Sequence, residues 1–476
     1  MSLSSSLFSG ISGLNTLGNA MTVIGDNIAN VNTIGFKASR ATFQDVLSQT
    51  VATTGGTAQV GRGTSLADIS SSFSQGSFES TDSTTDLAIG GSGFFIVRDP
   101  SSENNEYYTR AGEFRFDKEG NFINPGGCIV RGWELDENGE DIGSIKDIKL
   151  ESFTSPPSET NKMTVVTNLD SKASSNTSVL ENAWDGSADP PIGDTAFEYQ
   201  TTLKVYDSLG STHDITVYYD LDSGSTWEYI IVCNPSEDAR TGAVAAGNPT
   251  KGAGLLARGK IDFNDSSGLI STISMDLFDG SGGDWNDVSN AGNWTACSID
   301  PNGYFAFRPE FINGSPMAVE FDIGARYNGT NWIPDSLSST RYALASTTIF
   351  QSANGYGAGD LQSVTVGTDG VITGAYSNGE VIPLYRVALA KFQNMQGLYK
   401  EGENLFRETR LSGAPITGKP GTNGLGSISP NSLEQSNVDI ATEFVKMITT
   451  QRGFQANSKI ITVTDQMLAE LINLKR

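Results

Sequence analysis

The 476-residue chain has very few of the residues that form disulfides or bind transition metals. It contains three cysteines, Cys128, Cys233 and Cys297, which lie far apart and lack CxxC spacing, and one histidine, His213. A disulfide framework, a zinc site and a multi-histidine metal centre are therefore not indicated. We expect three buried thiols, and we expect His213 to be a surface or packing residue rather than a catalytic base.

Positive charge and long hydrophobic runs are also scarce. Lys and Arg number 31 against 55 Asp and Glu, which gives a formal net charge of −24. This balance argues against nucleic acid or an anionic membrane as a general partner. Apolar runs such as Phe94–Val97 and Tyr229–Cys233 have the length of strands, far short of the roughly 20 residues of a membrane span. The first basic residue is Lys37 and no continuous apolar core precedes it, so we expect neither a Sec signal nor membrane insertion.

Motifs for catalysis or cofactor binding are missing as well. The glycine clusters 90–93 and 421–426 lack the GxGxxG or Walker spacing followed by a helix. The acidic stretches 136–141 and 262–268 lack the glutamate that ends a calcium loop, so solvated turns explain them more simply. No pair of carboxylates stands out for glycoside hydrolysis. We therefore expect a protein that is not an enzyme and that has no cofactor, metal or catalytic residue.

What the chain does have is a heptad pattern at each end. In the last forty residues one position repeats every seven residues: Ile440, Met447, Phe454, Ile461 and Leu468. The half-steps between them are apolar at Phe444 and Ile472 and polar at Gln451, Ser458 and Asp465. This pattern predicts a helix whose seam is too polar in alternate layers for a simple two-stranded coil and therefore needs several neighbours. Ser436 with Asp439 indicates a capping box at its start.

The first 31 residues carry a matching pattern. One heptad position holds Leu7, Leu14, Met21 and Ile28, and the other holds Leu3, Leu17, Ile24 and Val31, interrupted by Gly10. The four internal glycines each cost about 1 kcal/mol of helix propensity, so we expect a helix that gains order from packing and ends near Ile34–Gly35. An ordinary core helix would show the same pattern. A heptad run at both termini, with β-like sequence between them, favours a terminal helix pair instead.

The middle of the chain has the composition of β domains joined by connectors. Residues Lys37–Asp86 and Leu411–Ser432 are rich in small and polar residues and predict extended connectors. Short apolar runs separated by turn residues predict antiparallel strands, for example at Phe94–Val97 and Phe122–Ile123. We predict a multidomain, mainly β fold, in which nested antiparallel β domains accompany N- and C-terminal α-helices that pair as a coiled-coil-like axial domain.

This layout divides the chain into three parts. The helical axial domain and connector comprise 1–70 with 425–476, and the core β domain comprises 71–165 with 351–424. An inserted outer β domain spans 166–350, with a candidate subdomain near 272–330.

Several motifs resemble those of bacterial flagellar axial proteins of the rod and hook class. The stretches 29–37, 85–95 and 108–114 are similar to the N-terminal signature and shared core domain of that class, and 436–439 and 451–457 are similar to its C-terminal signature. The residues that carry the terminal signatures are Asn30, Asn32, Thr33, Gly35, Phe36, Lys37, Ser436, Asn437, Asp439, Gln451, Arg452 and Asn457.

Within this class the chain is most similar to the flagellar hook proteins. The stretches that distinguish them are 205–210, 376–379 and 388–398, and a distal rod protein would lack most of the 166–350 insert. The resemblance is diffuse over 225–350, so no residue role is transferred there.

The resemblance implies a subunit of a curved tubular polymer that acts as a universal joint, transmits torque from rod to filament and encloses the export channel. It implies an extracellular location in the hook and export by the flagellar type III apparatus. The implied partners are further copies of the chain, the distal rod protein, the hook cap, the hook–filament junction protein and the export apparatus. The implied polymerisation interface comprises Leu7, Leu14, Leu17, Met21, Ile24, Ile28, Val31, Ile440, Phe444, Met447, Phe454, Ile461 and Leu468.

Two other functions are consistent with parts of the sequence. One is another axial subunit, from the distal rod or the hook–filament junction. The other is a secreted β-rich adhesin or glycan-binding protein, which the insert tryptophans Trp184, Trp227, Trp285 and Trp294 would suit. A free adhesin would not need paired terminal helices.

Overall fold

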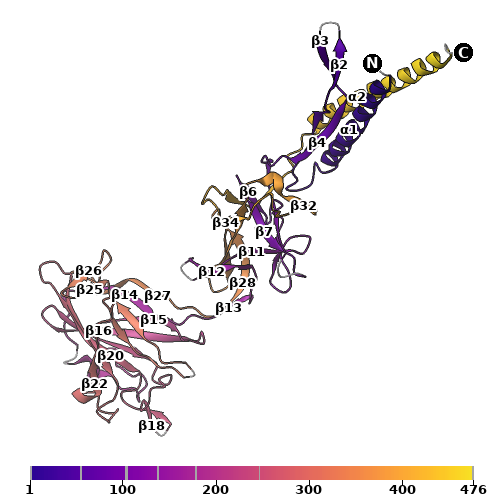
Figure 1. Cartoon of the computed structure of the whole chain (residues 1–476). Coiled ribbons are helices and arrows are strands. Elements are labelled where there is room, and N and C mark those ends of the chain that lie inside the picture. The colour runs from indigo at the N-terminus through magenta and orange to yellow at the C-terminus, as the bar shows by residue number, and fades with distance from the viewer. Residues whose placement is uncertain are drawn as a thin grey trace. The chain divides into compact units, whose positions relative to one another are not determined.

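The computed structural model describes residues 3–53, 56–101, 105–136, 139–176, 179–245, 247–312 and 314–473. It divides into two compact units: unit 1 comprises Met1–Phe153, Leu361–Tyr376 and Val381–Arg476, and unit 2 comprises Thr154–Asp360 and Ser377–Glu380. The predicted fold class is confirmed, because the chain is mainly β with one long helix near each end (Figure 1). Neither of these helices, within the described residues, has the length and apolar character that crossing a membrane requires.

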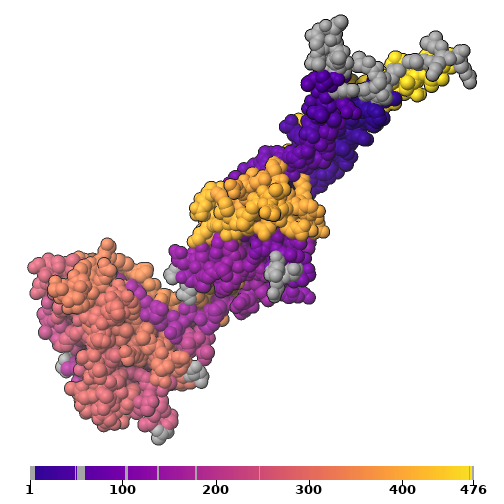
Figure 2. Space-filling view, in the orientation of Figure 1, coloured from indigo at the N-terminus to yellow at the C-terminus, as the bar shows by residue number. Residues whose placement is uncertain are grey.

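Unit 1 contains both long helices, α1 (Leu3–Ala29) and α2 (Ile440–Asn473). They lie side by side in Figure 1, and Figure 2 shows the indigo atoms of the N-terminal segment beside the yellow atoms of the C-terminal one. The pair is antiparallel, because Gly10 of α1 lies against Ile461 and Leu17 lies against Gly453. Helix α1 ends at Ala29, before the predicted Ile34–Gly35.

Strands occupy both of the predicted connectors. In the first, β1 pairs with β4 in antiparallel register from Ser39 opposite Ser71 to Asp45 opposite Thr64. Hydroxyl groups attach this ribbon to α1: the Thr64 backbone N–H donates to Ser12 Oγ at 3.2 Å. In the second connector, β34 (Ile416–Gly418), β35 (Ser427–Pro430) and β36 (Ser432–Glu434) pair with β31 (Leu389–Lys391), β6 (Leu87–Gly90) and β5 (Phe78–Ser80), respectively. Backbone pairing therefore orders segments whose composition alone predicts little structure.

The remaining strands of unit 1 form its β core. The main sheet has the order β28-β29-β30-β11-β7-β8-β33-β32, with β12 beside β11, β10 between β11 and β9, and β31 between β7 and β34. Its fully buried side chains include Phe95, Val130, Ile372 and Leu389. The strands of unit 1 are β1 (Ser39–Asp45), β2 (Gln49–Thr53), β3 (Gly56–Val60), β4 (Thr64–Ser71), β5 (Phe78–Ser80), β6 (Leu87–Gly90), β7 (Phe94–Arg98), β8 (Glu106–Thr109), β9 (Arg115–Phe116), β10 (Phe122–Ile123), β11 (Ile129–Leu135), β12 (Asp141–Asp147), β28 (Gly359–Val366, from Leu361 on), β29 (Val371–Tyr376), β30 (Val381–Val387), β31 (Leu389–Lys391), β32 (Tyr399–Gly402), β33 (Leu405–Arg407), β34 (Ile416–Gly418), β35 (Ser427–Pro430) and β36 (Ser432–Glu434), with the short helix η3 (Met395–Gly397).

Unit 2 is built on two sheets. One has the antiparallel order β15-β16-β17-β20-β21-β22, and the other has the order β23-β24-β14-β27, in which β14 and β24 are parallel. Their side chains share one core that includes Tyr219, Trp227, Phe307 and Phe321. The elements of unit 2 are β13 (Thr154–Ser155), β14 (Lys162–Asn168), η1 (Leu180–Ala183), β15 (Tyr199–Tyr206), β16 (Thr212–Ser223), β17 (Thr226–Cys233), β18 (Val244–Ala245), β19 (Asn248–Pro249), β20 (Leu255–Phe263), β21 (Ile270–Phe278), η2 (Ala291–Asn293), β22 (Trp294–Ala296), β23 (Phe305–Phe307), β24 (Val319–Asp322), β25 (Ala325–Tyr327), β26 (Trp332–Pro334) and β27 (Thr347–Ala353).

Candidate functional site: the terminal helices and their junction

Helix α1 meets α2 along a seam in which glycines bring the two backbones close together. A Cβ atom added to Gly10 would lie 3.1 Å from Cγ1 of Ile461, and one added to Gly13 would lie 2.7 Å from Nδ2 of Asn457. These contacts are tighter than ordinary van der Waals distances, so a Cβ at either position would force the side chain of Ile461 or Asn457 to move. The propensity cost of these two glycines is thus offset by close helix packing.

Polar residues alternate with apolar ones along this seam. Glu443 is 4% exposed and accepts hydrogen bonds from Asn27 Nδ2 at 3.4 Å and from Lys446 Nζ at 2.7 Å. Thr464 is 1% exposed and donates its hydroxyl to the carbonyl of Ile460. The buried polar residues Glu443 and Thr464 therefore each lie one residue before a half-step position of the heptad pattern, Phe444 and Asp465. The polar half-step residues do not enter the seam: Gln451 and Asp465 are exposed and Ser458 is half-buried.

The predicted interface residues fall into groups by exposure. Ile24 is buried, whereas Ile440, Phe444 and Phe454 are 45%, 48% and 44% exposed. The half-buried members are Leu7, Leu14, Leu17, Met21, Ile28, Val31, Met447, Ile461 and Leu468. Single-chain packing thus covers part of the predicted interface, and large apolar side chains on α2 have no covering partner among the described residues.

A buried ion cluster joins the helix pair to the β core of unit 1. The Glu434 side chain is 0% exposed and accepts hydrogen bonds from Lys37 Nζ at 2.6 Å and from the Gly76 backbone N–H at 2.9 Å. Its other oxygen accepts a bond from Arg110 Nη1 at 3.3 Å. Lys37 is itself 0% exposed and also donates to the Ser74 carbonyl at 2.9 Å. Segments from three distant parts of the chain therefore converge on one carboxylate.

Burial dominates the titration of the cations in this cluster. Desolvation lowers the pKa of Lys37 below its ordinary value, although the hydrogen bond and charge of Glu434 act in the opposite direction. Desolvation also lowers the pKa of Arg110, again against the effect of Glu434. Because two buried cations share one carboxylate, removal of that carboxylate would leave charge uncompensated in the interior.

Asn437 holds the start of the C-terminal segment against the N-terminal one. Its Oδ1 accepts a hydrogen bond from the Ala38 backbone N–H at 2.8 Å, and its Nδ2 donates to the carbonyls of Ser72 and Ser74 at 2.8 and 3.0 Å. Asn27 forms a similar bridge, because it exchanges two 2.8 Å bonds with the backbone of Ser39. Side-chain amides thus stand in for backbone pairing where α1, β1 and α2 meet.

Gly35 turns the chain between α1 and this junction. Its φ is +70°, and an added Cβ would lie 2.6 Å from the backbone nitrogen of Ala111. Its own N–H donates to the Glu434 carbonyl at 2.7 Å. Only glycine fits both the conformation and the close backbone approach.

The other signature residues have local roles or are exposed. Asn30 donates to the Asp26 carbonyl at 2.9 Å in the last turn of α1 and accepts a bond from the hydroxyl of Thr33. Phe36 lies under Lys400, whose Nζ is 5.6 Å from the ring centroid. Asn32, Asp439, Gln451 and Arg452 are exposed.

The cap of α2 differs from the predicted capping box. Helix α2 starts at Ile440, and Asp439 Oδ1 accepts a hydrogen bond from the Thr442 backbone N–H at 2.9 Å, so Asp439 is the N-cap. Ser436 Oγ instead accepts from the Val438 N–H at 3.3 Å, before the helix. The prediction that Ser436 caps the helix is wrong, because three residues of extended chain separate it from the first turn.

Glu434 is the residue of this site that the sequence did not indicate. It lies two residues before the recognised C-terminal signature, in a strand of three residues, β36 (Ser432–Glu434). A carboxylate in an acidic chain carries no periodic signal, and its cationic partners are hundreds of residues away. The structure shows that Lys37, a signature residue, is buried, and a buried ammonium group needs an anionic partner such as Glu434.

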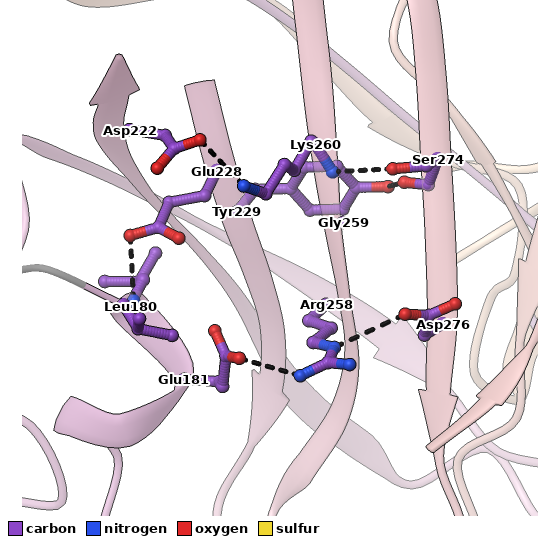
Figure 3. Close-up of a pocket in the computed structure, with 11 residues that line it drawn as sticks. Leu180, Glu181, Asp222, Glu228, Tyr229, Arg258, Gly259, Lys260, Ser274 and Asp276 are labelled. Atoms are coloured by element: carbon purple, nitrogen blue, oxygen red, sulfur yellow. Dashed lines mark hydrogen bonds and ion pairs between the residues drawn. The ribbon is translucent and has the colours of Figure 1, made fainter. Parts of the chain in front are cut away.

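Unit 2 contains a hollow of ≈ 370 Å³ lined by charged side chains (Figure 3). Arg258 Nη1 donates to Glu181 at 2.7 Å, and Lys260 Nζ donates to Asp222 at 2.7 Å. Burial, reinforced by the neighbouring carboxylates, raises the pKa of Glu228 to about 7. Since both cations already bind carboxylates of the same hollow, the arrangement fits a structural polar network better than a ligand site.

His213, Cys233 and Cys297 belong to unit 2, and Cys128 belongs to unit 1. His213 Nδ1 is 2.7 Å from Glu237 Oε2, and its ring stacks on Phe311 with centroids 3.7 Å apart. Cys128 and Cys233 are buried and Cys297 is half-buried, all as free thiols. Within the described part of the chain, no group of three or more His, Cys, Asp or Glu side chains is placed to hold a metal ion.

Four segments of the chain match models of known families. Residues 7–37 match the model described as "Flagella basal body rod protein", and residues 88–168 match "Flagellar hook protein FlgE/F/G D1 domain". Residues 168–356 match "Flagellar basal body protein FlaE D2 domain", and residues 429–474 match "Flagellar basal body rod FlgEFG protein C-terminal".

Individual relatives match from end to end. The chain is 33% identical to the flagellar hook protein FlgE of Borreliella burgdorferi over 488 residues, which cover 99% of each chain. It is 30% identical to that of Treponema pallidum over 99% of each chain and 28% identical to that of Salmonella typhimurium over 98% of each chain. A crystal structure of Helicobacter pylori flagellar hook protein FlgE2 matches 75% of this chain and 100% of that chain, at 16% identity and a TM-score of 0.46.

Proposed function

Because the chain belongs to the flagellar hook protein family, we propose that many copies of it polymerise into the curved tube of the hook, which transmits torque from rod to filament and encloses the export channel. The sequence resemblance to hook proteins is confirmed by the end-to-end similarity. The proposed assembly has no enzymatic step and needs no cofactor.

The observation that supports polymerisation most strongly is the uncovered apolar surface of α2. Phe444, Ile448 and Phe454 are 44 to 50% exposed, and Val445 is 62% exposed. A helix of a soluble monomer normally keeps such side chains against its own core. Contact with other copies would remove them from water, at roughly 25 cal/mol per Å² of apolar surface.

We assign different roles to the parts of the chain. The helices, with their connector, 1–70 and 425–476, form the inner tube. The core β domain, 71–165 with 351–424, surrounds it, and the insert 166–350 forms the outer layer. Torque then passes through the inner tube, and outer contacts between copies can slide as the hook bends.

This function fixes a location and a set of partners for the chain. It is exported by the flagellar type III apparatus, without a Sec signal, and assembles outside the cell. Its neighbours in the axial structure are the distal rod protein, the hook cap and the hook–filament junction protein.

Electron microscopy of the concentrated purified chain tests the proposal. The unmodified chain should form tubes, and Phe454→Asp should abolish them, because it would place a charge in the uncovered apolar surface. The matched control is Ile312→Asp in unit 2, where the side chain is also exposed, at 51%. Circular dichroism and proteolysis should show both variants folded.

The outcomes separate clearly. Tubes from the control and none from Phe454→Asp support the helix pair as the assembly surface. Normal tubes from Phe454→Asp, or an unmodified chain that stays monomeric under all assembly conditions, would contradict the proposal.

A further inference from the structure

Two of the four glycines in α1 have no explanation within the chain. Gly10 and Gly13 make room for α2, whereas a Cβ added to Gly18 or Gly25 would meet no atom of the described residues within 4 Å. Each of these glycines costs the helix about 1 kcal/mol relative to alanine. They stand seven residues apart and therefore lie on the same side of the helix.

Gly18 forms the floor of an apolar groove between the helices. The groove has a volume of ≈ 450 Å³ and is lined by Leu17, Gly18, Met21, Thr22, Gln451, Phe454 and Gln455. The Thr22 hydroxyl donates to the Gly18 carbonyl at 3.2 Å, so it is already satisfied within the helix. The groove therefore presents a mainly apolar surface wide enough for large side chains.

A separate apolar stripe lies on α2. It consists of Ile460, Val463 and Met467, which are 44%, 39% and 47% exposed. Each precedes by one residue a position that faces α1, as shown by the contact of Ile461 with Gly10 and the burial of Thr464. The groove residue Phe454 instead follows Gly453, which contacts Leu17 of α1. The stripe and the groove thus lie on opposite flanks of α2.

Building on the proposed function, we infer that the groove over Gly18 receives the Ile460–Val463–Met467 stripe of a second copy. The glycine floor lets the neighbouring helix approach closely, as Gly10 and Gly13 do within the chain. Because the groove and the stripe are different patches of one chain, the contact is heterologous. Repetition of such a contact does not close into a dimer and gives a ring or an open helical assembly.

The chemistry of the groove favours this occupant. None of the residues that line the groove is charged, so the groove offers no ion-pair partner to a charged ligand. The stripe supplies uncharged, half-exposed apolar side chains at helical spacing, which match a groove with a small-residue floor. Both surfaces are present in every copy, so one chain type suffices for assembly.

Cysteine crosslinking tests the pairing directly. The double variant Thr22→Cys, Val463→Cys is made in a background that carries Cys297→Ser, and assembled tubes are oxidised. Within one chain the two new thiols cannot meet, because Thr22 lies twelve residues beyond Gly10, or roughly 18 Å along the helix pair. Disulfides must therefore join different copies.

The double variant should give a ladder of covalent multimers, and an equimolar mixture of the two single variants should stop at dimers. Each single variant alone should give no crosslink. Dimers from either single variant alone, or uncrosslinked tubes from the double variant, would overturn the inference.

Gly18→Ala provides a second test, because it separates a role of Gly18 in assembly from a role in the monomer alone. Alanine should raise the hydrogen-exchange protection of α1 in the monomer, since its Cβ meets no atom and favours the helix. It should also raise the critical concentration for assembly at least about tenfold, by filling the floor under the neighbouring helix. Asn19→Ala is the matched control, because Asn19 is exposed on α1 outside the groove.

Assembly of Gly18→Ala at the same critical concentration as Asn19→Ala would overturn this inference while leaving the proposed function intact. Absence of tubes from the unmodified chain would overturn both.

Discussion

The buried carboxylate of Glu434 offers the sharpest test of how unit 1 is held together. Replacement by alanine removes the acceptor of three hydrogen bonds and leaves Lys37 and Arg110 without their counter-ion. Because the Lys37 and Glu434 side chains are both 0% exposed, solvent cannot replace the lost partner. Breaking a buried pair from one side costs about 3 to 5 kcal/mol, so we expect Glu434→Ala to lose that much local stability.

Hydrogen exchange of the full-length chain is the appropriate assay, because it reports opening of unit 1 separately from unit 2. Peptides from β36, the start of α2 and residues 35–40 should lose protection by a factor of about 10² to 10⁴. The pKa of Lys37 is lowered in the folded state, so as the pH rises the folded chain loses this buried positive charge at a lower pH than the unfolded chain does. The stability lost in Glu434→Ala should therefore become smaller as the pH rises toward that pKa.

Glu134→Ala is the matched control, because it breaks an exposed pair. Glu134 accepts from Lys146 Nζ at 2.7 Å, and the two side chains are 42% and 53% exposed, so the expected cost is below about 1 kcal/mol. The reasoning is refuted if Glu434→Ala costs no more than Glu134→Ala. Adding Lys37→Met to Glu434→Ala should recover part of the loss, since it removes one of the two uncompensated cations.

Other residues give smaller predictions with equally direct readouts. The folded-state pKa of Glu228, about 7, exceeds its ordinary value of 4.5, so its contribution to stability is complete below pH 4.5 and is lost as the pH rises through 7. Glu228→Gln should therefore stabilise unit 2 at pH 8 by about 2 to 4 kcal/mol, measured by tryptophan fluorescence in urea, and an unchanged pH profile would contradict this. Gly35→Ala should lower the free energy of local unfolding, measured by hydrogen exchange, by at least about 3 kcal/mol, because the new Cβ would lie 2.6 Å from the Ala111 nitrogen. Gly413 also has a positive φ but has open space around it, so Gly413→Ala should lower that free energy by only about 1 kcal/mol. Asp439→Ala should lower protection in the first turn of α2 by about 1 kcal/mol, and equal protection would show that Asp439 is not the cap.

The sequence predicted those parts of the fold that leave a periodic or punctuated signal. Heptads identified both helices, and turn residues separated runs that became β7 (Phe94–Arg98) and β10 (Phe122–Ile123). The connectors were harder, because the pairing of β1 with β4 depends on backbone groups and a few hydroxyls rather than on apolar side chains.

The candidate site was predicted in outline but not in its polar detail. The heptad pattern does not decide whether Asn457 or Ser458 faces α1 next to Ile461. The structure shows that it is Asn457, because its side chain packs against Gly13. Glu434 left no signal because its partners are distant in sequence. Glycine was interpreted as a cost to α1, whereas at Gly10 and Gly13 it creates the contact surface.

The central claim is that the paired termini of this chain build the inner wall of a polymer. Helical reconstruction by electron cryomicroscopy of tubes grown from the full-length chain tests it most directly. We predict that α1 and α2 form the innermost layer around the channel, with Ile460, Val463 and Met467 of one copy against the Gly18 groove of another. Tubes in which unit 2 lines the channel, or in which the two helices of each copy are separated, would contradict it.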